Sequence, residues 1–369
     1  MSSSLEGRID IRLTRAGETV TAVEICSSRP QLAQKLMAGR APEEAADLAG
    51  LIFSLCGKAQ KAAAQAACEA ARGLVPSRDA LRRREYDVLV ELAQEHAWRL
   101  LLNWPEQAGR SPDMPSLLAL RQAAAEPARF AAGLEHLLTT VLLGEPRETW
   151  LSRDLDGFEA WRTDGRTLVA KLFRDLDHGA DAGISCCALL PPLPAMNDAG
   201  ARALAEQALD DAAFCATPLW QSEPAETGAL ARVAERPLIA AWIARRGRGA
   251  VARLLARLLE LAELPQRLLA EPGAEGGAQV VRAWPLEDNA GMAGVETSRG
   301  LLLHVVRLKD GKVADYRIVA PTEWNFHPNG ALAQALSGLA AGPGLESRAR
   351  LVSQSLDPCV AYGVELNHA

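Results

Sequence analysis

Two cysteines near opposite ends of the chain stand in segments whose residue types could build a metal site. Cys56 lies in Phe-Ser-Leu-Cys-Gly-Lys-Ala-Gln (residues 53–60), and Cys359 lies in Asp-Pro-Cys-Val-Ala-Tyr (residues 357–362). A cysteine thiolate is a soft anionic ligand for a metal ion. About three hundred residues separate the two cysteines, yet both segments look like halves of one metal site.

The chain contains five further cysteines: Cys26, Cys68, Cys186, Cys187 and Cys215. The odd total and the absence of a Cys-x-x-Cys pair argue against a disulfide framework and against a structural zinc ribbon. A free cysteine is most often a small buried hydrophobe, and we interpret Cys26, Cys68 and Cys215 in this way. The adjacent Cys186 and Cys187, which precede a proline-rich loop, are candidate auxiliary thiols, although adjacent cysteines more often simply pack.

Composition limits the classes of protein to which the chain can belong. It has 369 residues, of which 49% are hydrophobic and 23% are charged, and its net charge is −6. That length is enough to bury a large core, and the slight acidity argues against a nucleic-acid-binding protein, which normally carries a basic face. No apolar run approaches the length of a membrane-spanning helix, and the first residues lack the pattern of a signal peptide. We therefore expect a cytoplasmic protein that binds no membrane.

Hydrophobic periodicity predicts the elements that must position Cys56. Residues 8–14 and 19–26 alternate on either side of a short turn, which is the pattern of a hairpin. An alanine-rich helix is expected from residue 42 to about residue 72, with Cys56 partway along it. A second helix is expected from residue 77 to residue 103, ending before a Trp-Pro pair.

The rest of the chain contains one clear hairpin pattern and several helical ones. Residues 301–309 and 313–319 read as two strands joined by Asp310-Gly311, a dipeptide typical of a tight hairpin turn. Helical spacing predicts further helices, and one apolar run predicts a strand: helices at 115–123, 127–142, 199–215, 236–263, 329–340 and 345–356, and a strand at 167–173.

These elements predict an α+β fold that is mostly α, with a helical bundle beside a small β-sheet built from hairpins at the two ends of the chain. We expect one domain over residues 1–369. Its expected parts are an N-terminal β-hairpin (1–30), a helical core (42–265), a β-hairpin region (278–326), and C-terminal helices with the second cysteine motif (329–369).

Five short motifs, in their order and spacing, resemble those of the large subunit of nickel–iron hydrogenases. They correspond to the family's Glu-Gly-His strand, its Arg-Ile-Cys-Gly-x-Cys motif, its Ala-Pro-Arg-Gly turn, its Val-Pro-Ser/Thr-x-Trp-Asn segment and its terminal Asp-Pro-Cys-x-x-Cys. The matching residues here are 5–10, 54–59, 297–300, 320–325 and 357–362. Each motif is weak alone, but the shared order is specific, and it implies a fold like that of the large subunit.

This chain departs from the family at the second cysteine of each pair, where Ala59 and Tyr362 stand. Alanine cannot bind a metal, and a neutral phenol is a poor soft ligand, so the two-metal centre of a hydrogenase could not form. Such a shortened relative looks like the HupK/HoxV hydrogenase maturation proteins, and residues 226–232 extend that likeness into the middle of the chain. The resemblance implies an assembly scaffold rather than an enzyme.

The resemblance also implies roles for individual residues. Cys56 and Cys359 would transiently hold an Fe(CN)2CO fragment, with no nickel, although in the family these two positions bind nickel only. Arg299, Pro321 and Thr322 match residues that surround the cyanide ligands. Arg299 could instead form a simple ion pair, and Thr322 could merely end a strand. Glu6 matches a glutamate beside the metal, and a capping role for it is an equal alternative.

The resulting hypothesis is a scaffold that accepts the iron fragment from HypC/HypD-type maturation proteins and passes it to a hydrogenase large subunit. Two alternatives remain open at this point. One is a metal-free mimic of the large subunit that only binds maturation chaperones, and the other is a degenerate hydrogenase-like enzyme. The retention of Cys56, Cys359, Arg299 and Thr322 together favours the carrier, because a mimic needs none of them.

Overall fold

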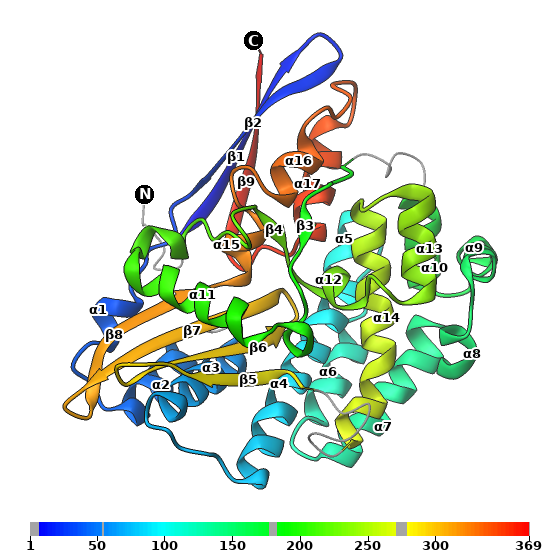
Figure 1. Ribbon diagram of the computed structural model, residues 1–369. Helices are drawn as coiled ribbons and strands as arrows, with labels where there is room; N and C mark the ends of the chain where they lie inside the picture. The colour runs from blue at the N-terminus through cyan, green and yellow to red at the C-terminus, as the bar shows by residue number, and fades with distance from the viewer. Residues whose placement is uncertain (1–6, 54, 177–182, 271–278, 369) are drawn as a thin grey trace.

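The computed structural model describes residues 7–53, 55–176, 183–270 and 279–368. The fold is α+β and mainly helical, as predicted, with two principal sheets. In Figure 1 the four-stranded sheet lies at the lower left, most of the helices lie to its right, and a three-stranded sheet rises toward the top. No helix in the described ranges is long and apolar enough to cross a membrane.

The two ends of the chain build the three-stranded sheet. The predicted N-terminal hairpin is confirmed as β1 (Arg8–Ala16) and β2 (Thr19–Ser27). The third strand, β9 (Ala361–His368), pairs in parallel with β1, so that Tyr362 lies opposite Ile9. This strand was not predicted, since only helices and the cysteine motif were expected there. Because β9 begins two residues after Cys359, within the second cysteine motif, its pairing holds that motif against the N-terminal hairpin.

Helices α2 (Pro42–Ile52) and α3 (Gly57–Ala71) replace the single helix predicted over residues 42–72, which was therefore wrong. The chain turns back between them because Gly57 packs directly on α2. A Cβ atom added to Gly57 would lie 2.6 Å from the carbonyl oxygen of Gly50, so that only glycine fits. As a result Cys56 is the N-cap residue of α3, rather than one in the middle of a helix.

The alanine-rich face of α3 packs against the four-stranded sheet. A Cβ atom on Gly291, in the second strand of that sheet, would lie 2.4 Å from the carbonyl oxygen of Ala67. The helix and the strand therefore approach so closely that only glycine fits at this position. The antiparallel strands follow the order of the chain: β5 (Val281–Pro285), β6 (Ala290–Thr297), β7 (Gly300–Lys309) and β8 (Lys312–Val319). The predicted hairpin is confirmed as β7 and β8, with Asp310 and Gly311 at positive φ in the turn.

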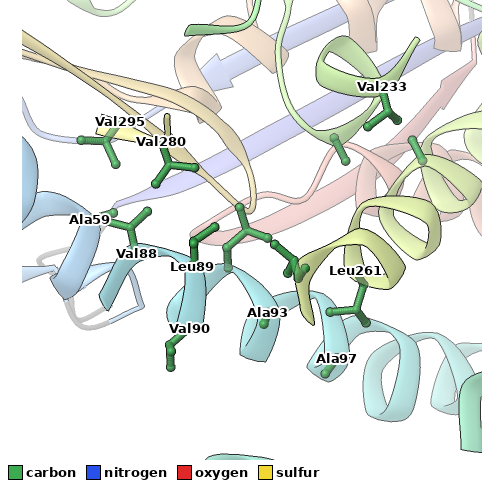
Figure 2. Packing of buried hydrophobic residues seen from close by; sticks show 14 of the residues in the cluster. Ala59, Val88, Leu89, Val90, Ala93, Ala97, Val233, Leu261, Val280 and Val295 are labelled. Atoms are coloured by element: carbon green, nitrogen blue, oxygen red, sulfur yellow. The ribbon is translucent and has the colours of Figure 1, made fainter. Parts of the chain in front are cut away.

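The helical layer is centred on α4 (Arg78–Trp98) and α14 (Ala250–Leu269). Figure 2 shows Leu89 and Ala93 of α4 in the core that joins these two helices, with Leu261 of α14 nearby and Val295 of the sheet beyond. The α4 helix runs on through a π-helical turn, η1, into α5, past the Trp-Pro pair where it was predicted to end. The π-helical turn η1 spans Arg99–Asn103. The other α-helices of this layer are α5 (Trp104–Gln107), α6 (Met114–Gln122), α7 (Pro127–Leu137), α8 (Arg147–Leu151), α9 (Leu155–Asp164), α10 (Leu168–Asp175), α12 (Ala229–Val233) and α13 (Pro237–Arg246).

Two predictions for this layer were wrong. The strand expected at 167–173 is helix α10, because the Thr167 side chain accepts a hydrogen bond from the Ala170 amide and caps the helix. The helix expected at 236–263 is divided into α13 and α14 at Gly247, whose φ of +77° ends the first helix.

The C-terminal helices connect the two sheets. After β8 the chain forms α15 (Pro321–Asn325) at the end of the strand, then α16 (Ala331–Leu336), which is shorter than predicted. The helix predicted at 345–356 is confirmed as α17 (Leu345–Ser355), and it packs with α16 in a core shared with β1 and β2. The remaining short elements are α1 (Ala33–Met37), β3 (Ala188–Leu189), β4 (Ala225–Glu226) and α11 (Asp198–Asp210).

Candidate metal-binding site

A cavity of about 420 Å³ lies where the two ends of the chain meet. Five of the predicted site residues line it together, although they come from the start of α3, the β6–β7 turn, α15 and the segment before β9: Cys56, Arg299, Pro321, Thr322 and Cys359. The sixth, Glu6, lies outside the described residues. The two cysteine motifs therefore lie at the wall of one cavity.

The start of α3 holds Cys56 in the cavity wall. The carboxylate of Glu91, from α4, accepts hydrogen bonds from the backbone amides of Lys58 (2.8 Å) and Ala59 (3.2 Å) and so caps the helix. Burial, reinforced by the charge of Glu91, raises the pKa of the Cys56 thiol to about 12. Burial likewise raises the pKa of Glu91 to about 7. The metal-free site thus holds Cys56 as a thiol, and a metal ion must displace its proton.

Asp357 fixes the segment that carries Cys359. Its backbone has a positive φ of 59°, and its fully buried carboxylate faces three guanidinium groups, those of Arg99, Arg257 and Arg299. Burial alone would raise the pKa of Asp357, but the three positive charges outweigh it and hold that pKa far below its ordinary value. The aspartate of this motif therefore anchors the segment to α14 and to the β6–β7 turn.

Thr322 provides the hydrogen bond that Cys359 receives. Its hydroxyl donates to the Cys359 sulfur at 3.0 Å, and its side chain is buried. Pro321 begins the short helix α15 and sets the direction of Thr322 toward the cavity. The alternative in which Thr322 merely ends a strand is therefore not what the geometry favours.

Arg299 projects from the tight turn between β6 and β7, and only 4% of it is exposed. Its Nη2 atom binds Glu95 at 2.7 Å, and its Nε atom lies 3.5 Å from Asp357. Neither Nε nor Nη1 has a hydrogen-bond partner among the residues that the structure describes. The alternative of a simple ion pair with the nearby Glu296 is not what the structure shows, because Glu296 binds Arg232. A buried guanidinium with unused donors could bind an anionic group in the cavity.

The backbone of this turn is held from behind. The Asn325 amide donates to the Arg299 carbonyl oxygen at 3.2 Å, and its own oxygen accepts from the Thr227 amide at 2.9 Å. Gly300 has a φ of +130°, and a Cβ atom there would lie 2.4 Å from the Thr227 methyl group. The hydrogen bond from Asn325 to Arg299 thus connects the Trp-Asn pair of α15 to the Ser-Arg-Gly turn.

Several residues of the site were not predicted. Arg29, from the loop after β2, forms a 2.7 Å ion pair with Glu323 in the cavity wall. Gln60 also lines the cavity, next to Cys56. Glu323 and Gln60 lie within or beside the motifs and could have been noticed, whereas no sequence pattern marks Arg29.

The structure does not bring Cys186 and Cys187 to the cavity. Cys186 is exposed, and Cys187 is buried in the core under α16 and α17, where its thiol lies 3.1 Å from the Pro224 carbonyl oxygen. Cys68 and Cys215 are buried, as interpreted from the sequence. Cys26 is exposed on β2, so its interpretation as a buried residue was wrong.

The positions of the missing family cysteines offer no further metal ligand. Ala59 is fully buried within α3, and Tyr362 lies on β9, where burial raises the pKa of its hydroxyl although the charge of Arg350 acts in the opposite direction. Neither residue lines the cavity. In the described ranges there is also no group of three or more histidine, cysteine or acidic side chains that could hold a metal ion. The protein thus offers two thiols to the cavity.

This fold is that of the nickel-dependent hydrogenases. The family model for nickel-dependent hydrogenase matches residues 227–365. Chains of the Ni-Fe-Se hydrogenases from D. vulgaris Hildenborough (TM-score 0.56, 16% identity, 94% of this chain and 95% of that one) and Desulfomicrobium baculatum (TM-score 0.59, 15% identity, 94% and 95%) have the same fold.

Sequence similarity places the chain more narrowly. The hydrogenase expression/formation protein HoxV of Cupriavidus necator is 33% identical over 371 residues, which cover 92% of each chain. The HupK protein of Rhizobium leguminosarum bv. viciae is 31% identical and covers 98% of this chain and 97% of its own. The chain belongs to the HoxV/HupK family of hydrogenase expression/formation proteins.

Proposed function

We propose that this protein is a hydrogenase maturation factor that transiently carries an Fe(CN)2CO fragment during assembly of the nickel–iron cofactor. The observation that supports this most is the joint position of Cys56, Cys359 and Arg299 on one cavity. Two thiols can bind one soft iron centre, and the unused donors of Arg299 suit the anionic nitrogen atoms of cyanide. The relatives' names, hydrogenase expression/formation proteins, support the maturation role.

The residues of the cavity fit this cargo in size and charge. A volume of about 420 Å³ is within the range of roughly 300–1,000 Å³ typical of small-molecule sites. Around Asp357, three guanidinium groups face two carboxylates, those of Asp357 and Glu95. The unused donors of Arg299, which does line the cavity, favour an anionic group there, such as an iron centre with two thiolate and two cyanide ligands.

The same residues argue for one metal ion and for reversible binding. With Ala59 and Tyr362 outside the cavity wall, the chain provides no bridging thiolate for nickel, so we expect no nickel. Only two protein–metal bonds must break for release, which suits a carrier rather than an enzyme. We propose that the fragment arrives from HypC/HypD-type maturation proteins and is passed to a hydrogenase large subunit.

Infrared spectroscopy of the anaerobically purified full-length protein tests this function. The intact protein, made in a cell with complete maturation machinery, should show cyanide and carbon monoxide stretching bands together with stoichiometric iron. Cys56→Ala and Cys359→Ala should each abolish the bands and the iron, because each removes a soft anionic ligand. Arg299→Ala should leave iron bound at lower occupancy and shift the cyanide bands.

Cys26→Ala is the matched control, because it removes an exposed thiol on β2 and should leave the spectrum unchanged. Cys187→Ala tests the auxiliary thiol and should also leave it unchanged, since that side chain packs elsewhere. Protein from a competent host that shows neither bands nor iron would contradict the carrier function and favour a metal-free mimic of the large subunit. Hydrogen turnover by the purified protein would instead favour the degenerate enzyme.

A further inference from the structure

A chain of three buried side chains leads from Cys56 into the protein interior. The Gln60 Nε2 atom lies 3.6 Å from the Cys56 sulfur, and its Oε1 atom lies 2.8 Å from His304 Nε2. The other ring nitrogen of His304 lies 2.7 Å from the Tyr316 hydroxyl. Gln60, His304 and Tyr316 are contributed by α3, β7 and β8, and all three are almost completely buried. The group therefore depends on the packing of α3 against the sheet.

The hydrogen bonds of this group have one consistent direction. Burial lowers the pKa of His304 to about 3, so its ring is neutral and has one donor and one acceptor nitrogen. In the described part of the chain, the one hydrogen-bond partner of the Tyr316 hydroxyl is His304. The hydroxyl must therefore donate to Nδ1, which leaves Nε2–H to donate to the Gln60 oxygen.

The opposite direction has two costs. It would leave the buried Tyr316 proton without an acceptor, and it would turn the Gln60 carbonyl oxygen toward the sulfur. The observed order instead turns the Gln60 amide N–H groups toward Cys56. The Thr322 hydroxyl likewise donates a hydrogen bond to the Cys359 sulfur. Among the described residues, each of the two sulfurs thus has one side-chain donor.

We propose that Gln60 is a positioning residue for the metal-binding thiolate of Cys56, held in its donating orientation by His304 and Tyr316. The identity of the cargo in this inference rests on the proposed function, whereas the hydrogen bond to the sulfur does not. An N–H donor stabilises the thiolate charge and orients its lone pairs. It also reduces the electron donation from sulfur to the metal, which eases the release of a carried fragment.

Cobalt(II) added to the metal-free, full-length protein is the probe, because thiolate-to-cobalt charge transfer gives an absorption band that reports on sulfur. Gln60→Asn is too short to reach the sulfur but keeps the amide, and Gln60→Leu removes the amide. Both should move the band to longer wavelength, because an unbonded sulfur holds its electrons less tightly and the charge-transfer transition then needs less energy. Tyr316→Phe should shift the band in the same direction by less, since it frees the His304 tautomer. Gln65→Leu, a partly exposed glutamine of the same helix, is the control and should change nothing.

Several outcomes would overturn the inference. One is a band that stays at the wild-type wavelength in both Gln60 variants while Cys56→Ala abolishes it. Another is a wild-type cobalt spectrum in Cys56→Ala, because cobalt would then not bind the thiol that Gln60 contacts. If circular dichroism shows that Gln60→Leu does not fold, the comparison is made with Gln60→Asn alone.

The iron-loaded protein provides a second measurement, in which Gln60→Asn should lower the carbon monoxide stretching frequency because the iron becomes more electron-rich. An unchanged frequency in loaded Gln60→Asn would count against the inference. A shifted cobalt band in protein that never shows diatomic bands would instead separate the two proposals. The carrier function would then fail, and the role of Gln60 toward Cys56 would stand.

Discussion

Cys56 and Cys359 are held in different ways, although they share one cavity. Cys56 is the N-cap residue of α3, and the Glu91 carboxylate accepts hydrogen bonds from the first amides of that helix. Cys359 instead lies two residues after Asp357, whose carboxylate is held by three arginines. Among the described residues, each sulfur receives one hydrogen bond from a side chain, that of Gln60 for Cys56 and that of Thr322 for Cys359. The electronic properties of a bound metal should therefore be sensitive to each of these two donors.

At the residue scale, Thr322→Val tests the donor to Cys359. Valine has nearly the same shape but no hydroxyl, so the 3.0 Å hydrogen bond to sulfur is lost while the packing stays. We expect iron to remain bound, with the carbon monoxide band at lower frequency because Cys359 donates more charge to the metal. Thr163→Val removes an exposed hydroxyl that bonds only to its own helix and should leave the infrared spectrum unchanged. Loss of iron from Thr322→Val would mean that the hydroxyl is itself required for binding.

At the scale of the elements, the break between α2 and α3 decides where the first thiol lies. A continuous helix would place Cys56 on a helix face, whereas the break places it at a helix start that opens into the cavity. The break depends on the close approach of Gly57 to Gly50. A glycine also permits the close contact between α3 and the sheet, because Gly291 allows β6 to approach Ala67.

Gly57→Ala tests this arrangement. The added Cβ would meet the Gly50 carbonyl oxygen at 2.6 Å, so α2 and α3 must separate, at a cost of about 1–3 kcal/mol in the free energy of unfolding. We also expect reduced iron loading, because the shift moves Cys56. Gly133→Ala is the matched control in α7, where the nearest atom would be 3.7 Å away, and it should stabilise the helix by up to about 1 kcal/mol. Denaturant unfolding of both variants measures the difference, and equal stabilities would show that the break has another cause.

At the scale of the whole molecule, buried ion pairs join the helical layer to the two ends of the chain. Asp357 connects the segment before β9 to Arg99 and to Arg257 of α14, and Arg299 connects the sheet to Glu95 of α4. A second set lies deeper, where Glu260 of α14 binds Arg232 and His96. The position of Cys359 relative to Cys56 therefore depends on contacts spread over the entire chain.

Asp357→Asn should be among the most damaging single changes. It leaves three buried guanidinium groups with one carboxylate fewer, which should cost about 3–5 kcal/mol in the free energy of unfolding at neutral pH. The pKa of Asp357 is depressed in the folded state, so its contribution is complete above the ordinary carboxyl pKa of about 4 and is lost as the pH falls toward the folded-state value. The stability difference between wild type and variant should therefore narrow in acid.

Denaturant unfolding at several pH values measures this difference. Asp47→Asn, which breaks an exposed ion pair with Lys61, is the control and should have a small effect at every pH. A loss in Asp357→Asn that is as small as that of the control would contradict the anchoring role of Asp357.

Local sequence patterns were enough to predict the two hairpins and the main residues of the candidate site. Alternation and turn dipeptides predicted the two hairpins, β1–β2 and β7–β8, because strand period and turn geometry are set by adjacent residues. The motifs identified Cys56, Cys359, Arg299 and Thr322 as a set, and all four line one cavity. The helix break and the strand β9 were missed because both depend on contacts with distant segments.

What only the tertiary structure decided is how those residues are held. The amino-acid sequence determined which chemical groups are present: two thiols, a guanidinium and a hydroxyl in short motifs. It did not reveal that Asp357 meets three arginines, or that Gln60, His304 and Tyr316 form one buried chain of hydrogen bonds. Such groups have no characteristic spacing, since their members are brought together by the packing of α3, α4 and α14 around the sheet. Burial then sets their charge states and hydrogen-bond directions, because a buried polar group must find its partner within the protein.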